Sequence, residues 1–466
     1  MFQRSAFLST LLTYVITCGE GASDRTLLKI SYRGAPLDIR LVPTMISQAA
    51  AVSGEGASFL SQDDHECERC FGLDGMIYDL RAVGVQIVES TCSVGYEQIL
   101  NYLRKARAIL GIQFYCEPDS VVTISPINGP IKASETCTGG NPVLGTNDPG
   151  SSCQRNLEVI NIGQAWRYAR EAKRELKDIV LAISDTGVDM THPDLVGQFW
   201  KSPKDGSIGY NFITNSIDVT DDNGHGTHCA GNAAAHTNNS IGIAGLANIN
   251  GSAPKVKLMI LKFLDAGGGG SYSGAVRALN FAVENGATVS SHSYGGGSSD
   301  IVRIAFENAA AAGHITVAAA GNEGASLEAF PTYPCCLAKN IPSMICVAAS
   351  TSNPSESITL AGFSNAGSVT KVAAPGVNIY STIPVNTYGY KSGTSMSTPT
   401  VAGVAALLAT LGLVGEDITN AIVASRKIGV PNQFNLRDIG ELDALNATHI
   451  AIDSIRRMAS EATEAP

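Results

Sequence analysis

Ser395 stands in the sequence Gly393-Thr394-Ser395-Met396-Ser397-Thr398-Pro399, directly before the run 401–409, which is apolar on every face. Such a run predicts a buried helix. A serine at the N-terminal end of a helix lies beside unpaired backbone N–H groups and the positive end of the helix dipole, both of which stabilise a developing oxyanion. The plainer alternative is a serine that only caps the helix, so a nucleophilic role requires a base and an acid elsewhere.

Three further polar residues stand where a base, an acid and an amide donor could act. They are Asp185 at the end of a hydrophobic run, His225 in a Gly-His-Gly-Thr-His sequence, and Asn322 on a glycine turn after an apolar run. Each has an ordinary alternative. Asp185 could be a turn residue, His225 and His228 could be a metal pair, and Asn322 could be a turn former. Together with Ser395 they could supply a nucleophile, its base, an orienting carboxylate and an oxyanion donor.

The elements that must position these residues alternate between buried strands and helices. Short apolar runs predict parallel strands at 178–184, 256–261, 287–290, 315–320 and 343–348. Helical spacing separates several of them, at 161–177, 273–285, 300–312 and after Ser395. The alternation predicts an α/β fold with a doubly wound, mostly parallel sheet. Sites in such folds lie outside the carboxyl ends of the strands, where Asp185 and Asn322 fall.

The chain before residue 157 has a different character. Residues 1–22 combine Arg4, a short apolar run and small residues, which is typical of a secretory signal peptide. Strand-like and helical stretches at 24–125 (strands at 27–32, 83–88, 111–115 and 121–124, a helix at 96–110) predict a small α+β unit, whereas 35–63 shows no clear pattern. Residues 126–156, rich in Gly, Pro, Ser and Thr, predict an exposed linker. We expect one domain at 157–450 and a tail at 451–466.

Charge and cysteine content exclude some classes of partner. The 466 residues include 32 basic and 42 acidic ones, a net charge of −10, which argues against nucleic acid and anionic membranes as partners. Beyond the N-terminus we expect no transmembrane span. Of 11 cysteines, 10 follow the signal peptide, so disulfides are expected. Cys67 and Cys70, beside His65, could be half of a metal site, although a disulfide or structural role fits better.

The four motifs together resemble one family. Asp185-Thr186-Gly187, His225-Gly226-Thr227-His228, the Gly321-Asn322 turn and Gly393 to Pro399 are similar to the signatures of subtilisin-like serine proteases, in the same chain order. The resemblance extends from about 157 to 447. The position of Cys229, beside the histidine motif, is similar to that of a cysteine in the proteinase K and thermitase branches. One difference is Ser397-Thr398, where many members have Ala-Ser.

The resemblance implies an endopeptidase made as a zymogen. Ser395 would be the nucleophile, His225 the base, Asp185 its orienting acid and Asn322 the oxyanion donor. A peptide or protein substrate would lie between two strand-like edges, with further contacts at the rim and base of the specificity pocket; these residues are Gly269, Gly270, Ser293, Tyr294, Gly295, Glu323 and Thr332. The Tyr333-Pro334 bond is often cis in the family. The unit at 24–125 occupies the place of the family's inhibitory propeptide, and the mature enzyme would be a secreted monomer without a catalytic cofactor.

The resemblance also implies a structural calcium ion. The candidate ligands are the Asp194 carboxylate, the Asn239 amide and the carbonyls of Thr237, Ile241 and Ile243, with Gln154 a weaker candidate. The alternative for the 237–243 loop is a plain turn that carries a glycosylation sequon at Asn238. Further sequons begin at Asn250 and Asn446.

Two other classes of function stay open at this point. The first is a catalytically idle relative that acts as a binding protein with its prodomain attached. The second is a secreted lipase or esterase, which would need a Gly-x-Ser-x-Gly elbow and a different order of catalytic residues.

Overall fold

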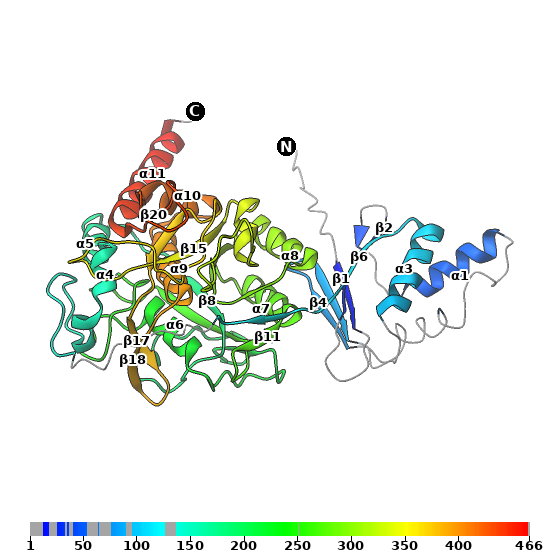
Figure 1. Ribbon diagram of the computed structural model, residues 1–466, viewed down its shortest axis with the longest axis horizontal. Helices are drawn as coiled ribbons and strands as arrows, with labels where there is room; N and C mark the ends of the chain where they lie inside the picture. Colours follow the sequence, from blue (N-terminus) through cyan, green and yellow to red (C-terminus); the bar gives the residue numbers. More distant parts are fainter. Residues whose placement is uncertain are drawn as a thin grey trace. The chain divides into compact units, whose positions relative to one another are not determined.

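The computed structural model describes residues 13–17, 26–32, 35–36, 41–53, 64, 76–89, 96–125, 137–249 and 251–464. The chain divides into two compact units, one formed by 1–120 with 299–308 and the other by 121–298 with 309–466 (Figure 1). The candidate catalytic residues all belong to the second unit.

In its described residues, the first unit combines two small sheets with helices α1 and α3 and most of α8. One sheet has the strand order β1-β5-β4 and the other β3-β2-β6; the strands are β1 Thr13–Thr17, β2 Thr26–Tyr32, β3 Ala35–Pro36, β4 Met76–Leu80, β5 Val85–Glu89 and β6 Gln113–Pro118. Helix α3 (Tyr96–Leu110) has the predicted bounds. It buries Tyr102, Leu103 and Ala106 at helical spacing. Strand β1 lies within the expected signal peptide, so the mature chain would lack it.

Helix α1 (Val42–Ser53) falls in the stretch for which the sequence showed no clear pattern. Val42 and Ile46, four residues apart, are buried. The run of small residues that follows them gives a weak amphipathic signal, which explains why the helix is hard to recognise from sequence.

A nine-stranded sheet forms the centre of the second unit. Its order is β19-β20-β16-β15-β14-β12-β8-β10-β9, and every neighbouring pair is parallel except β19 and β20. The strands are β8 Ile179–Asp185, β9 Gly209–Asn211, β10 Val256–Lys262, β12 Val289–His292, β14 Ile315–Ala319, β15 Met344–Ser350, β16 Val372–Pro375, β19 Lys427–Ile428 and β20 Gly440–Glu441. After β10 the chain crosses to the other side of β8, so a switch point lies between β8 and β12.

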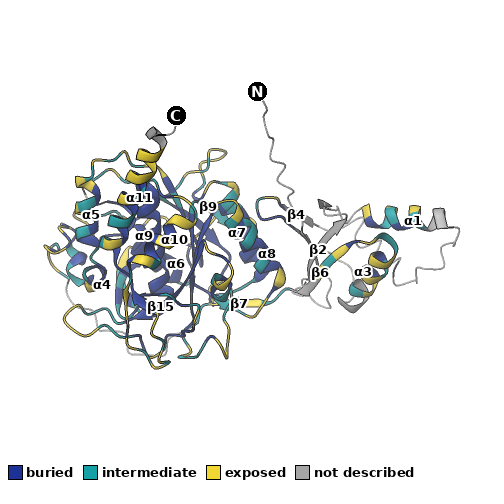
Figure 2. Cartoon of the chain, turned by 90° about the horizontal axis from the view of Figure 1, so that it is seen from above, coloured by how far each residue is buried: buried dark blue, intermediate teal, exposed yellow. Residues whose placement is uncertain are grey.

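Helices cover both faces of this sheet, as the doubly wound prediction requires. One core cluster of described residues joins alternate residues of β8 and β10, with Val289 of β12, to six helices, namely α4 Arg155–Val159, α5 Ile162–Glu171, α6 His225–Ala234, α9 Thr394–Leu411, α10 Glu416–Ser425 and α11 Ala444–Glu464. The intervening residues Ala182, Met259 and Leu261 are also buried, and α7 (Tyr272–Glu284) packs against β8 and β10. Figure 2 shows this buried interior. Helix α8 spans Asp300–Ala311.

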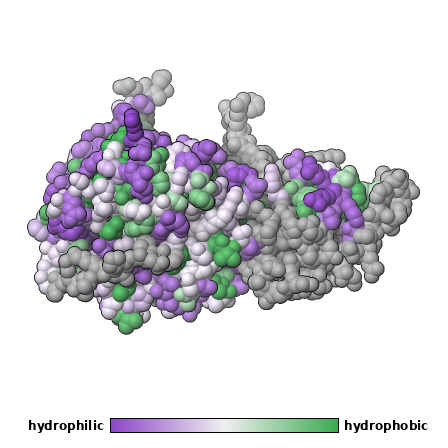
Figure 3. Space-filling model, in the orientation of Figure 1, coloured by the Kyte–Doolittle hydropathy of each residue, from purple (hydrophilic) through white to green (hydrophobic). Residues whose placement is uncertain are grey.

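Helix α9 is the central helix of the core. All of its residues from Thr394 to Leu411 are buried. Within the described residues it is the one helix whose length and hydropathy would suit a membrane span, and its complete burial inside the unit is that of a core helix. The visible face of the second unit carries mostly hydrophilic side chains with small, separated hydrophobic groups (Figure 3).

Two predicted boundaries were wrong. The described part of the expected linker, 137–156, is folded: it contains the 3-10 helix η2 (Pro149–Cys153), the start of α4 (Arg155–Val159) and the Cys137–Cys153 disulfide. Its polar residues are used inside the fold, so their composition did not indicate exposure. The expected tail at 451–466 begins inside α11, where Ala451 and Ile452 are buried in the main core.

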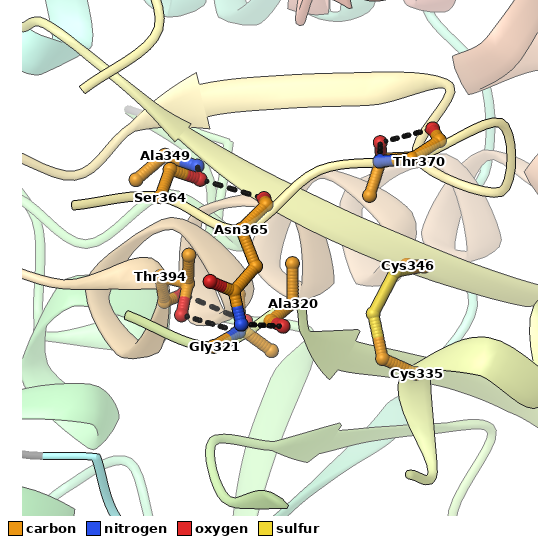
Figure 4. Close-up of a disulfide and its surroundings, with 11 residues drawn as sticks. Ala320, Gly321, Cys335, Cys346, Ala349, Ser364, Asn365, Thr370 and Thr394 are labelled. Carbon is orange, nitrogen blue, oxygen red and sulfur yellow. Dashed lines mark hydrogen bonds between the residues drawn. A yellow bond between two sulfur atoms is a disulfide. The ribbon is translucent and has the colours of Figure 1, made fainter. Parts of the chain in front are cut away.

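The state of six cysteines can be given for the described part of the chain. Cys137–Cys153 and Cys335–Cys346 are bonded, which confirms the expectation for these four residues; the second bridge joins the 3-10 helix η3 (Cys335–Lys339) to β15 (Figure 4). Cys229 and Cys336 are free thiols. Cys67 and Cys70 lie outside the described residues.

Candidate active site

Asp185 and His225 meet where the carboxyl end of β8 faces the first residue of α6. His225 Nδ1 lies 2.8 Å from Asp185 Oδ1, and the backbone N–H of Thr186 donates to the same oxygen at 2.7 Å. Because a carboxylate only accepts, His225 must donate from Nδ1, which leaves Nε2 free to act as a base. A Cβ on Gly226 would lie 2.2 Å from Gly187 O, so this close approach of helix to turn requires glycine.

Asp221 holds the start of α6 and was not foreseen. Its carboxylate accepts from Gly224 N and Thr227 N and from the hydroxyls of Thr186 and Thr227, at 2.6–2.9 Å. Burial raises the pKa of Asp221, but the hydrogen bonds outweigh it and leave the pKa below its ordinary value. An acidic residue just before a helix N-terminus is a recognisable capping signal and could have identified it.

The second histidine and the nearby thiol do not form a metal site with this pair. His228 is fully buried, and its Nε2 donates to Ile379 O at 2.9 Å. Asp185, His225 and Cys229 have ligand-type atoms within 4.8 Å of one another. However, Asp185 and His225 already bond to each other, and burial raises the pKa of the Cys229 thiol. The motif therefore acts as a helix start carrying one reactive imidazole.

Ser395 lies in the first turn of α9 and is 6% exposed. Its hydroxyl donates to Ser293 O at 3.3 Å, and Ser293 Oγ donates to Ser395 O at 3.1 Å. Within the described residues, the structure gives Ser395 Oγ no hydrogen bond to His225. Contacts between nucleophile and base often tighten only when a reacting substrate is bound.

Asn322, which follows β14, is oriented by Thr394. Its Oδ1 accepts from Thr394 N at 2.8 Å and from Thr394 Oγ1 at 2.9 Å, and Thr394 Oγ1 accepts from Gly321 N (Figure 4). With Oδ1 engaged in this way, Nδ2 is directed elsewhere, and it donates to Ser125 O at 2.9 Å. An amide that donates to a carbonyl oxygen next to a serine hydroxyl is suited to stabilising an oxyanion.

Residues 121–125 lie in the cleft as an extended strand. Strand β7 (Val121–Thr123) is antiparallel to β11 (Gly269–Ser271) on one side and to β13 (Gly295–Gly296) on the other. The segment continues to a cavity beside the catalytic residues, lined by Ser125, Ser293, Tyr294, Gly295, Ala319, Gly321, Asn322, Thr394 and Ser395. The two edges expected to pair with a substrate strand therefore pair here with the chain's own residues, and 121–125 pack with the second unit rather than with the preceding unit.

The two remaining expected substrate residues, Glu323 and Thr332, have other neighbours. Glu323 Oε2 accepts from Asn365 Nδ2 at 2.5 Å. The Thr332 methyl carbon would lie 2.6 Å from a Cβ on Gly295, so it packs closely against that edge. Neither Glu323 nor Thr332 lines the cavity itself as far as the described residues show. The Tyr333–Pro334 bond is cis, as the resemblance implied.

The expected calcium ligands gather around two carboxylates. Asp194 and Asp148 are fully buried. Asp194 accepts from Asn239 Nδ2 and Ile243 N, while Asp148 accepts from Asn238 N and Asn239 N. Burial, with a further contribution from the charge of Asp148, raises the pKa of Asp194 to about 7. Asp148 could not be recognised from the sequence, because it lies 46 residues from Asp194 in a Gly- and Pro-rich stretch.

The chemistry of the candidate oxygen donors suits a hard cation after one adjustment. In the described part of the chain, the carbonyl oxygens of Thr237, Ile241 and Ile243 accept no hydrogen bond. The Asn239 amide now turns its nitrogen toward Asp194 and its oxygen toward Ile241 N, so it would have to rotate to act as a ligand. Gln154 is not a ligand here, because its amide is fully engaged with the backbone of Ala244.

Comparison with known proteins decides the family. The model of the subtilase family matches residues 176–431. The chain is 41% identical over 282 residues to thermitase of Thermoactinomyces vulgaris, which covers 59% of this chain and 89% of thermitase. The chain belongs to the subtilase family. It is a serine endopeptidase of the subtilisin type, and the lipase or esterase alternative is excluded.

A second subtilase matches a longer stretch of the chain. A thermophilic serine proteinase of Bacillus sp. (strain AK1) is 33% identical over 380 residues, covering 77% of this chain and 87% of that relative. A crystal structure of a cold adapted subtilisin-like serine proteinase is 30% identical, covers 58% of this chain and 89% of its own, and has a TM-score of 0.46.

Proposed function

We propose that this subtilase hydrolyses peptide bonds through an acyl-enzyme, with Ser395, His225, Asp185 and Asn322 in the roles given above. Ser395 Oγ attacks the scissile carbonyl carbon as its proton passes to His225 Nε2. His225 then protonates the leaving amine, and water releases the acyl group by the same route. Asp185 holds Nδ1 and stabilises the imidazolium. The observation that carries the proposal is the Asn322 amide, oriented by Thr394 and bonded to Ser125 O beside Ser395.

Hydrolysis of casein by the mature enzyme tests this proposal. We expect turnover that a serine-directed phosphonate blocks and that Ser395→Ala lacks. Correctly matured protein without any turnover of casein or short peptides would instead support the idle-relative alternative.

We further propose that the enzyme is made as a secreted zymogen. Support comes from residues 121–125, which occupy the cleft in the manner of the acyl part of a substrate, with the Ser125 carbonyl oxygen on the Asn322 amide. A propeptide that ends here would inhibit by remaining bound after cleavage. The maturation cut then lies after Ser125 and before Cys137, because Cys137 is tied to the second unit through Cys153. Mass spectrometry of the mature N-terminus tests this range.

Autocatalysis makes a separate prediction about processing. In cells without other active copies, Ser395→Ala should accumulate as a precursor that has lost only its signal peptide. Normal maturation of this variant would mean that another protease makes the cut. A separately expressed 24–125 segment should inhibit the mature enzyme at micromolar concentration. Full enzyme activity in the presence of this segment would contradict the inhibitor role.

We also propose that calcium stabilises the mature enzyme through Asp194, Asp148, the rotated Asn239 amide and the carbonyls of Thr237, Ile241 and Ile243. An oxygen-rich, buried site with two adjacent carboxylates suits Ca²⁺, and the bound ion would neutralise the repulsion between the two carboxylates. Mg²⁺ fits poorly, because it demands a smaller octahedral shell. The ion would act on stability and not on the chemical step.

We expect the mature enzyme to be a monomer in the secretory route or outside the cell.

A further inference from the structure

Four buried side chains behind the cleft form a continuous chain of hydrogen bonds. Tyr294 OH lies 2.8 Å from His292 Nδ1, and His292 Nε2 lies 2.7 Å from Ser290 Oγ. Ser290 Oγ lies 2.7 Å from His314 Nε2, and His314 Nδ1 lies 2.7 Å from Ala287 O. None of the four side chains is more than 3% exposed. We call this set the Tyr–His–Ser–His chain.

The sheet brings these residues together. Ser290 and His292 are two residues apart on β12, so their side chains share a face, while Val289 points into the core that contains α9. His314 comes directly before β14, which pairs with β12 through Ile315 and Val289. Polar side chains in the interior of a central parallel strand are costly unless they are satisfied. Here each one is bonded to the next.

The direction of every proton in the chain follows from its fixed end. Ala287 O can only accept, so His314 Nδ1 donates to it. Burial lowers the pKa of His314 to about 4 and that of His292 to about 3, the latter with a further contribution from His314. Both imidazoles are therefore neutral at pH 7, and each carries one N–H. His314 Nε2 must then accept from the Ser290 hydroxyl.

The same reasoning extends to the cleft. The Ser290 hydroxyl has donated its only proton, so its oxygen accepts from His292 Nε2–H. His292 Nδ1 carries no proton and accepts from the Tyr294 hydroxyl. The chain therefore has one orientation, in which Tyr294 donates inward and every link has one donor and one acceptor.

Tyr294 stands at the point where this chain reaches the cleft. Its ring packs edge-on against that of Phe263, with 4.8 Å between the ring centroids, and Tyr294 is one of the residues that line the cavity beside Ser125 and Ser395. The residues on either side of it also belong to the site. The carbonyl of Ser293 accepts from Ser395 Oγ, and Gly295 pairs with Thr123 of the bound strand.

We propose that the Tyr–His–Ser–His chain positions Tyr294 as a wall of the cleft and thereby sets how tightly the substrate strand binds. Tyr294 belongs to the substrate edge that the family resemblance already implied, and the new assignment is that His292, Ser290 and His314 are positioning residues that act through it. This inference rests on the proposed proteolytic function of the same cleft. Because Tyr294 would contact the bound substrate and takes no part in breaking the scissile bond, its displacement raises KM and leaves kcat nearly unchanged.

Kinetics with matched variants test the proposal. The substrate is a peptide that copies residues 121–125, Val-Val-Thr-Ile-Ser, followed by a chromogenic amide. Tyr294→Phe keeps the ring but removes the donor, and we expect its KM to rise roughly threefold to tenfold, as the loss of one hydrogen bond implies, with kcat within about twofold. Tyr168→Phe is the control and should match the parent, because Tyr168 is a half-buried tyrosine of α5 whose ring contacts His449 outside the cleft.

Two substitutions of His292 test the proton direction. His292→Asn places an acceptor near the position of Nδ1 and should keep a KM close to that of the parent. His292→Gln places a donor near the position of Nε2 but offers Tyr294 no acceptor, so its KM should rise as in Tyr294→Phe. The opposite ranking of the two variants, or a parental KM in Tyr294→Phe, would overturn the proposal.

A spectroscopic measurement does not depend on variants or on turnover. Side-chain ¹⁵N shifts of the purified enzyme at pH 7 should show neutral imidazoles, with the proton of His292 on Nε2 and that of His314 on Nδ1. An imidazolium or the other tautomer at either residue would overturn the assigned direction. If the enzyme hydrolyses no peptide, the proposed function is wrong. The shifts would still show whether the imidazoles of the Tyr–His–Ser–His chain have the assigned protonation states and tautomers.

Discussion

Glu441 of β20 carries a buried carboxyl group, and its replacement by glutamine should stabilise the enzyme at alkaline pH. The residue is 4% exposed, Ser350 Oγ donates to its Oε1 at 3.0 Å, and within the described residues its Oε2 has no hydrogen-bond partner. Burial raises the pKa of Glu441 from an ordinary 4.5 to about 8, against the opposing effects of the Ser350 hydrogen bond and the Lys427 charge.

The sign of the effect follows from proton linkage. The folded state holds this proton more tightly than the unfolded state. The contribution of Glu441 to the free energy of unfolding is therefore greatest below pH 4.5 and is lost as the pH rises through about 8. Each pH unit between the two pKa values corresponds to about 1.4 kcal/mol, so the whole interval amounts to roughly 5 kcal/mol as an upper limit. Relaxation and water entry around the charge reduce this, so we expect Glu441→Gln to gain about 2–5 kcal/mol at pH 9.

Guanidinium unfolding between pH 5 and pH 9 measures this difference. The mature enzyme should be inhibited with a phosphonate to prevent self-digestion, and tryptophan fluorescence can report unfolding. Glu441→Gln should match the parent at pH 5 and exceed it increasingly up to pH 9. Glu284→Gln, at an exposed position of α7, is the control and should follow the parent throughout. A stability difference between Glu441→Gln and the parent that is the same at pH 5 and pH 9 would refute the reasoning.

Three further predictions follow from other parts of the second unit. EDTA should lower the Tm of the mature enzyme, and calcium but not magnesium should restore it. At 100 times its Kd, the ion raises the free energy of unfolding by about 2.7 kcal/mol. An Asp194→Ala variant with the parental response to EDTA would falsify the site. Val385 has a left-handed backbone (φ 66°) and is 83% exposed, so Val385→Gly should stabilise the β17–β18 hairpin (Ile379–Ile383 and Thr387–Lys391) by about 1 kcal/mol in thermal unfolding, whereas an unchanged or lower Tm would speak against strain there. Asn322→Ala should lower kcat about 100-fold or more with little change in KM, and a parental kcat would remove Asn322 from the oxyanion site.

Some features of this protein are local, and the sequence determined them. The buried strand before Asp185, the apolar helix after Ser395 and the glycine turn at Asn322 each depend on the hydrophobic pattern or the glycines of a few consecutive residues. The order of these motifs along the chain was enough to indicate the family. Helix α3 could likewise be bounded from its spacing, because its polar and apolar faces are distinct.

Other features depend on contacts between distant segments, and only the tertiary structure decided them. Asp148 meets the 237–243 loop because the Cys137–Cys153 bridge and η2 fold a stretch whose composition resembles a linker. Ser290, His292 and His314 form one chain because β12 and β14 are neighbours in the sheet. Residues 121–125 occupy the cleft because β11 and β13 leave two strand edges facing each other. Each depends on groups 20 or more residues apart, and no local pattern encodes which distant groups the fold will bring within hydrogen-bonding distance.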